Sequence, residues 1–302
     1  MLLGLTSAVG YSAANLALRR LSGDHADLGW AIWVSAMKAV PTMVLALLLL
    51  TRRRIQGQPL YPTLRPIPAL IVAGLVMQFG GNLGFQLALG HVGLAISVPL
   101  VFAFIISAGA FLGRIFLGDQ VSRRTVMAIG VMMSSIVLLS YAAMQTDEGT
   151  DSAAGYVEGI AWMGLLYGTM SGISYGVNGV VLRRVARRAL PVESVLLIYS
   201  TTGVIGLSAV GAAMLGTDRL QAITSTQWLT MMTAGTFNAI AFFAVTHALK
   251  ILNITHVNVI NAAQNAMCAV GAVLLFAEPV TNPMAFGILL SITGLVLLDR
   301  KQ

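Results

Sequence analysis

Charged residues are scarce in this sequence: Asp, Glu, Lys and Arg make up only 10% of its 302 residues. A soluble protein carries about 25%. Hydrophobic residues account for 57%, and the mean hydropathy is +0.84. So little charge excludes an ordinary soluble enzyme and a disordered chain. The net charge of +7 does not indicate a nucleic-acid partner either, because the basic residues lie at the ends of apolar runs. The composition predicts a polytopic membrane protein.

Cysteine is almost absent as well. The single cysteine, Cys268, lies inside an apolar stretch, which excludes a disulfide framework and a metal site built on several cysteines. The sequence has no GxxxxGK[ST] loop for ATP and no HExxH motif. We therefore expect no cofactor, no metal and no enzymatic activity of the intramembrane protease or acyltransferase kind.

Apolar runs of the length needed to cross a bilayer, about 20 residues, recur along the whole chain. They predict an all-α fold of ten transmembrane helices, with no room for a soluble domain. The chain begins apolar without a basic segment, so a cleaved signal peptide is not expected. The predicted spans are Leu2–Leu18, Leu28–Leu50, Ile67–Leu89, Leu94–Leu117, Thr125–Met144, Gly159–Leu182, Val195–Leu215, Trp228–Leu249, Ile254–Ala277 and Met284–Leu298.

The basic residues indicate how these spans are oriented, because Lys and Arg collect in cytoplasmic loops. With the N-terminus inside, the outer segments hold only Arg19, Arg20 and Arg219, and all four tryptophans fall at outer span ends. We therefore predict that both termini are cytoplasmic. The inner segments hold Arg52, Arg53, Arg54, Arg65, Arg123, Arg124, Arg183, Arg184, Arg187, Arg188, Lys250, Arg300 and Lys301.

The two halves of the chain share a sequence pattern. YSAANLALRRL (Tyr11–Leu21) aligns with YGVNGVVLRRV (Tyr175–Val185), and LGDQV (Leu117–Val121) aligns with FAEPV (Phe276–Val280). QLALG and THALK end the third and eighth spans in the same way. The alignment predicts two five-span repeats, residues 1–144 and 157–302. Because five is odd, the second repeat is inverted in the membrane, a common plan for secondary transporters.

Ten spans, two five-span halves and the pairs Gly118-Asp119 and Ala277-Glu278 resemble the bacterial EamA branch of the drug/metabolite transporter superfamily. The resemblance implies a bundle in which spans 1–4 and 6–9 surround a central cavity and spans 5 and 10 pack outside. It implies a multi-pass protein of the bacterial inner membrane that moves small metabolites, including amino acids, often outward. Members often have a proline in the second half of spans 4 and 9, whereas Pro99 lies early in the fourth.

Amide side chains recur at four-residue spacing in the third span, where Gln78, Asn82 and Gln86 fall on one helix face. Polar side chains in hydrocarbon usually face the bundle interior or a wet cavity, although they also join helices by hydrogen bonds. Since amides and hydroxyls both donate and accept, we predict that they line a cavity for a neutral or zwitterionic solute. The further candidates on other spans are Tyr11, Asn15, Tyr175, Asn178, Asn238, Asn258, Asn261 and Asn265.

Lys38 lies deep in the second span, roughly 15 Å from the outer end at 1.5 Å per residue, which is further than a lysine stem can reach back. Facing lipid there would cost at least about 2.5–3.5 kcal/mol, so we expect a wet cavity or a partner. No Asp or Glu lies deep in any predicted span, so a buried salt bridge to Lys38 is hard to assemble. We predict that Lys38 receives a carboxylate or phosphate of the substrate. The alternative is a structural lysine, charged or neutral, that donates to carbonyls or amides.

The sequence thus predicts a secondary transporter, by family analogy an exporter, of amino acids or similar carboxylated metabolites, working by alternating access. Two alternatives stay open. An exporter of drug-like or cationic compounds would need a carboxylate deep in the membrane. A transporter of phosphorylated or nucleotide sugars would need more than one buried cation. His247 and His256 could make protons the coupling ion, or they are interfacial hydrogen-bonding residues.

Overall fold

The computed structural model describes residues 2–23, 27–61, 64–118, 122–147, 161–186, 190–251, 261, 263–278 and 280–299. All regular structure within these residues is helical, which confirms the all-α prediction. The helices are α1 (Leu2–Ser22), α2 (Leu28–Ile55), α3 (Ile67–Leu75), the π-helix η1 (Val76–Leu83), α4 (Gly84–Leu117), α5 (Arg123–Asp147), α6 (Ala161–Ala186), α7 (Val192–Gln221), α8 (Ser225–Ile251), α10 (Ala263–Phe276) and α11 (Asn282–Asp299).

Among the described residues, four helical stretches are long and apolar enough to cross a membrane: Leu28–Ile55, Ile67–Leu117, Val192–Gln221 and Ser225–Ala248. The stretch Ile67–Leu117 contains two of the predicted spans. They are separated at Gly93, whose backbone (φ 71°, ψ 180°) is not helical and belongs to a region that essentially only glycine occupies. The count of ten crossings stays a prediction, as does the cytoplasmic location of the termini.

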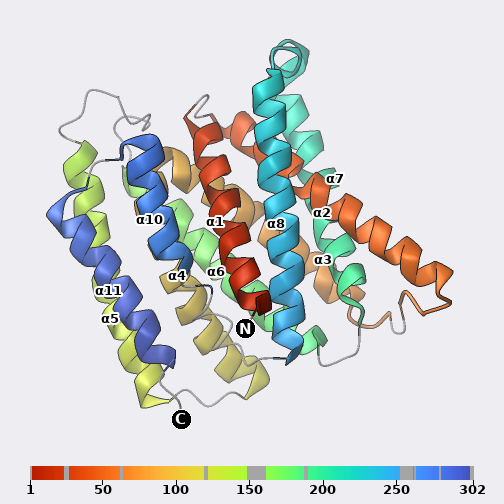
Figure 1. Ribbon diagram of the computed structural model, residues 1–302, viewed down its shortest axis with the longest axis horizontal. Coiled ribbons are helices and arrows are strands. Elements are labelled where there is room, and N and C mark those ends of the chain that lie inside the picture. The colour runs from red at the N-terminus through yellow and green to blue at the C-terminus, as the bar shows by residue number, and fades with distance from the viewer. Residues whose placement is uncertain are drawn as a thin grey trace.

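The helices pack in pairs that are distant in sequence. α4 packs on α6, α2 on α7, α1 on α8 and α5 on α11. In Figure 1 the α5–α11 pair forms one side of the bundle and α2 lies toward the other. α1 begins and α11 ends at the same end of the bundle, here called the termini end; α1 ends and α2 begins at the opposite end, here called the α1–α2 end (Figure 1).

Glycine permits the closest of these approaches. A Cβ at Gly172 in α6 would lie 2.6 Å from the carbonyl oxygen of Val101 in α4, and a Cβ at Gly235 in α8 would lie 2.7 Å from that of Lys38 in α2. Small residues at helix contacts are typical of membrane proteins, where close packing, rather than the hydrophobic effect, drives helices to associate. The most completely buried segment is the first half of α4, Gly84–Val101, and η1 before it buries one face, which carries Gln78 and Asn82.

Candidate functional site

Lys38 lies in the buried centre of the bundle, as the sequence predicts, and is only 3% exposed. Its Nζ donates a hydrogen bond to Oδ1 of Asn82 in η1 at 2.7 Å. Its backbone is fixed by the tight contact with Gly235 of α8, which also touches Pro41 one turn further along α2. The lysine is therefore held from behind by α8 while its side chain reaches across to η1.

Asn82 connects the lysine to the second half of the chain. Its Oδ1 also accepts from the hydroxyl of Tyr175 in α6 at 2.6 Å, and its Nδ2 donates to Oε1 of Gln78 at 2.6 Å. Gln78 in turn donates to the carbonyl oxygen of Tyr199 in α7 at 2.7 Å. Lys38, Gln78, Asn82 and Tyr175, here called the lysine cluster, thus join α2 and η1 to α6 and α7.

The local backbone explains why these side chains meet. η1 is a π-helix, a rare form that is frequent at functional sites, and it places Gln78 and Asn82 within bonding distance of each other. A Cβ at Gly81 would lie 2.9 Å from the Tyr175 ring, and one at Gly203 in α7 would lie 2.6 Å from the Gln78 amide. Glycine at both positions lets α6 and α7 close on η1.

Within the described residues, Lys38 has no acidic partner. Among the described residues the buried charged side chains are Arg19, Lys38 and Glu278, and Arg19 pairs with Glu278. The partner of Lys38 is a neutral amide. An ammonium group with only neutral neighbours in a low-dielectric interior is strongly attracted to an anion.

Two hydroxyl groups lie on the same face of α2 as Lys38 and can form further hydrogen bonds. Ser35 and Thr42 lie three and four residues from Lys38, and both are buried. Neither side-chain oxygen has a hydrogen-bond partner within the described part of the chain. Buried polar groups are normally paired, so these hydroxyls point to a bound solute or water beside the lysine. Sequence analysis did not single out Ser35, although its i, i+3 spacing from Lys38 was the available signal.

The other predicted site residues lie elsewhere. Gln86 donates to Ser22 Oγ at 2.7 Å near the α1–α2 end, Asn15 contacts the sulfur of Cys268 at 3.9 Å, and Asn265 donates to Ser291 of α11 at 3.1 Å. Tyr11 is half-buried and packs in one apolar cluster with Tyr175. Asn178 and Asn261 are buried, and each has a side-chain oxygen without a hydrogen-bond partner among the described residues. Asn238 is half-buried, and Asn258 lies outside the described residues.

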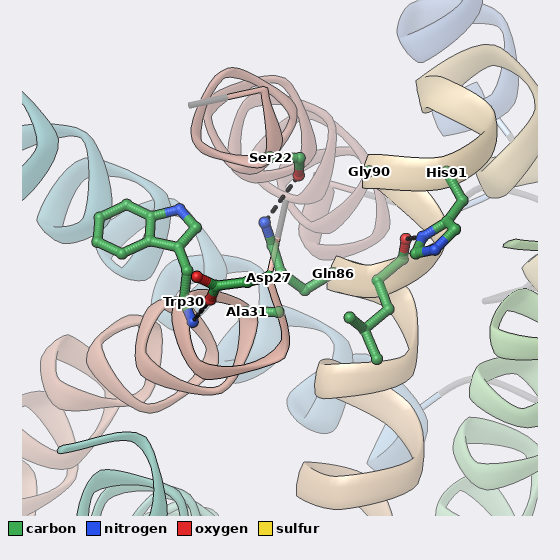
Figure 2. Close-up of a pocket in the computed structure, with 8 residues that line it drawn as sticks. Ser22, Asp27, Trp30, Ala31, Gln86, Gly90 and His91 are labelled. Carbon is green, nitrogen blue, oxygen red and sulfur yellow. Dashed lines mark hydrogen bonds between the residues drawn. The ribbon is translucent and has the colours of Figure 1, made fainter. Parts of the chain in front are cut away.

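A small pocket at the α1–α2 end surrounds Gln86 (Figure 2). Its lining includes Ser22, Asp27, Trp30 and His91. Asp27 accepts from the backbone N–H of Trp30 at 2.6 Å and so caps α2, and it forms an exposed ion pair with Arg219 of α7. The pocket therefore belongs to the packing of this end and is separate from the lysine cluster.

A buried salt bridge that the sequence analysis did not predict lies away from Lys38, between Arg19 and Glu278. Nε of Arg19 lies 2.7 Å from Oε1 of Glu278, and the two side chains are 2% and 1% exposed. Sequence analysis placed Arg19 in an outer connecting segment and Glu278 at a span end. Hydropathy predicts that a charge at a span end is solvated, whereas here both charged side chains are buried where α1 packs on α10. The only advance signal was the repeat, which aligns both positions with charged residues.

Residues 162–299 match the model of the EamA-like transporter family. The match covers the second half of the chain and supports membership of that family. The match bears out the resemblance drawn from the sequence, and it suggests a membrane transporter of the drug/metabolite superfamily.

Solved structures show the same fold. Of 26 matching chains, one titled "Crystal structure of protein" superposes with a TM-score of 0.65 at 18% identity, and the alignment covers 98% of this chain and 96% of that one. At that identity the likeness concerns the fold alone. No curated protein matches the chain.

Proposed function

We propose that this chain is an EamA-type secondary transporter of small carboxylated metabolites such as amino acids, and that Lys38 binds the carboxylate. The observation that carries the proposal is a lysine that is 3% exposed and bonded to a neutral amide. A substrate carboxylate would neutralise this charge. The unpaired hydroxyls of Ser35 and Thr42 would bind its other oxygens or its ammonium group.

Alternating access would follow from two inverted five-helix repeats, residues 1–144 and 157–302. Two packing pairs support the repeat: α2 contacts α7 and α5 contacts α11, and each pair joins helices at corresponding places in the order of the two halves. Gly118 after α4 and Ala277 after α10 are both left-handed, with φ of 69° and 50°, and each precedes an acidic residue. The lysine cluster, contributed by both repeats, would then lie where the halves rock against each other.

The described charges favour this substrate class over a cationic compound. Glu278, the buried carboxylate of the described part, already accepts from Arg19 and from the backbone N–H groups of Leu94 and Ala95. Its charge is therefore already balanced by Arg19, which disfavours a role in binding a cationic substrate. We infer export as the direction of transport from the family, with the bacterial inner membrane as location and protons as the coupling ion to be tested.

The test is counterflow of radiolabelled solutes by the purified protein in liposomes, with and without a proton gradient. Lys38→Met keeps the length and apolar stem of the side chain and removes its charge, while Lys38→Arg keeps the charge. Arg219→Gln, at an exposed ion pair, is the matched control. Size-exclusion profile and melting temperature establish that each variant folds.

Counterflow of an amino acid that Lys38→Met abolishes and Lys38→Arg partly retains would support carboxylate binding at Lys38. Counterflow of neutral or cationic solutes that is indifferent to Lys38→Met would contradict it. Counterflow of phosphorylated sugars in place of amino acids would keep Lys38 as an anion site and change the substrate class.

A further inference from the structure

We propose that Arg19 and Glu278 form a latch that closes the α1–α2 end of the bundle, and that the pair must separate each time the substrate site opens toward that end. The inference depends on the proposed alternating-access function. It concerns a pair of residues that takes no part in the lysine cluster.

The pair joins three separate segments of the chain. Arg19 belongs to the last turn of α1, and Glu278 follows directly after α10. The Glu278 carboxylate also accepts from the backbone N–H of Leu94 at 2.9 Å and of Ala95 at 3.0 Å. These N–H groups begin the helical turn that follows the Gly93 break, so the carboxylate caps a helix start from a distant part of the sequence. One side chain thus holds α1, α4 and the end of α10 together.

The backbone is strained at Ala277, the residue directly before Glu278. Ala277 has φ of 50°, a conformation that is disfavoured for residues other than glycine. The N–H of Glu278 donates back to the carbonyl oxygen of Ala272 at 3.2 Å. The Arg19 guanidinium lies 5.8 Å from the centre of the Phe276 ring, within range of a cation–π contact. Strain of this kind persists only where the surrounding contacts offset it, so the latch holds the connection in place.

Separation of these segments is what opening toward this end requires. α1 and α4 come from the first half of the chain and α10 from the second, and α1 packs against α10. If one half rocks against the other, the contact between α1 and the end of α10 must break on the side that opens. A buried ion pair is strong while intact and costly to leave half-formed. It therefore favours one closed arrangement, as a two-state gate needs.

Cys268 is a native reporter for this movement. It is the single cysteine of the chain, is fully buried in α10, and contacts Asn15 of α1 at 3.9 Å. Parting α1 from α10 would expose its thiol. The experiment measures the rate at which a membrane-impermeant methanethiosulfonate reagent modifies Cys268, applied to one or the other face of oriented vesicles that contain the full-length protein.

Two substitutions break the latch with opposite changes of charge. Glu278→Gln keeps an oxygen that can accept from Leu94 and Ala95 but removes the negative charge, whereas Arg19→Gln removes the positive one. A purely electrostatic effect on the thiol would have opposite signs in the two variants. We expect both to raise labelling from the α1–α2 face by about tenfold or more, because breaking a buried pair strongly favours the separated state. Labelling from the other face stays unchanged, as it does in the control Arg219→Gln.

Wild-type labelling rates in both folded variants would overturn the latch, as would equal increases from the two faces, which indicate general loosening. If neither variant folds, Arg19→Cys with Glu278→Cys in a Cys268→Ala background allows a short bifunctional thiol reagent to bridge the segments. Counterflow should then stop on cross-linking and return when the bridge is cleaved. Full transport by the cross-linked protein would overturn the latch and leave the proposed function intact.

Discussion

Lys38 Nζ lies 2.7 Å from Asn82 Oδ1, and the same oxygen accepts from the hydroxyl of Tyr175 at 2.6 Å. An amide oxygen thus receives two donors, one from each half of the chain. In the transport cycle we propose, the substrate carboxylate competes with this oxygen for the lysine. The amide is therefore the resting partner that a stronger acceptor displaces.

Replacement of this amide by a carboxylate tests that relationship. Asn82→Asp would place a permanent negative charge beside Lys38 and form the ion pair that the substrate otherwise completes. We expect the variant to fold with an unchanged or raised melting temperature and to lose amino-acid counterflow. Asn82→Ser, which leaves the lysine available, should transport with a raised KM. Wild-type transport by Asn82→Asp would show that Lys38 does not bind the carboxylate.

Thr42→Val tests the unpaired hydroxyl on the Lys38 face. The two side chains have similar shape, and the Thr42 oxygen is buried without a hydrogen-bond partner among the described residues. If the hydroxyl had only a packing role, removing it would leave transport unchanged and raise stability, because burying an unpaired hydroxyl costs about 1–3 kcal/mol. We expect stability to rise while the KM for the solute increases, since a buried substrate hydrogen bond is lost. KM and melting temperature, measured together, separate the two roles.

Much of the helix layout could be predicted from the sequence because its causes are local. Apolar runs define α2 and α8, and the four-residue spacing of Gln78 and Asn82 correctly predicts one shared face. The depth of Lys38 in its span correctly predicts that it is buried with a partner. The π-helical geometry of η1 could not be predicted, because α- and π-helices share the same polar spacing over one turn.

Residues that depend on tertiary contacts were harder to assign. Gln86 and Asn265 are amides in apolar spans with the same kind of helical spacing as Asn82. Gln86 nevertheless bonds to Ser22, and Asn265 bonds to Ser291 of the peripheral helix α11. Arg19 is buried in an ion pair with Glu278, which is distant in sequence, and no property of α1 indicates this partner. The sequence predicts that a polar residue in a membrane bundle has a hydrogen-bonding partner. The fold determines which residue that partner is.

Gly235→Ala should disturb the support behind Lys38. The added Cβ would lie 2.7 Å from the Lys38 carbonyl oxygen and 2.7 Å from Pro41 Cγ. We expect a loss of about 1–3 kcal/mol in the free energy of unfolding, as overpacking usually costs, together with reduced transport. Gly179→Ala in α6 is the matched control, because nothing lies within 4 Å of its Cβ position. That change should be neutral or stabilising by up to about 1 kcal/mol. Equal effects of the two substitutions would contradict the tight α2–α8 contact.

Gly118 and Ala277 should respond in opposite ways to exchange of glycine and alanine. Both have left-handed backbones after their helices, with φ of 69° and 50°, and the conformation costs residues other than glycine about 1–2 kcal/mol. Gly118→Ala should lower the free energy of unfolding by about that amount. Ala277→Gly relieves the strain but enlarges the freedom of the unfolded chain, so its net gain should stay below about 1 kcal/mol. Denaturation in detergent measures both; stabilisation by Gly118→Ala would contradict the left-handed conformation.

The sequence repeat predicts a counterpart of the Arg19–Glu278 pair. Register alone aligns Arg183, in the last turn of α6, with Arg19, and aligns Asp119, which lies outside the described residues, with Glu278. If the halves are inverted repeats, these two residues serve the termini end as the latch serves the α1–α2 end. We therefore expect Asp119→Asn and Arg183→Gln to impair counterflow to the same degree.

Exchange of the two charges provides the decisive measurement. The double variant Asp119→Arg with Arg183→Asp keeps opposite charges at the two positions and should recover part of the counterflow that each single substitution removes. Arg184→Gln, at the exposed neighbouring position, is the control and should transport normally. Additive losses in the double variant, with the protein folded, would show that the two residues do not interact and that the repeat does not extend to its charged ends. Recovery would instead indicate that the same electrostatic device operates at both ends, because coupled charges give non-additive effects whereas independent sites do not.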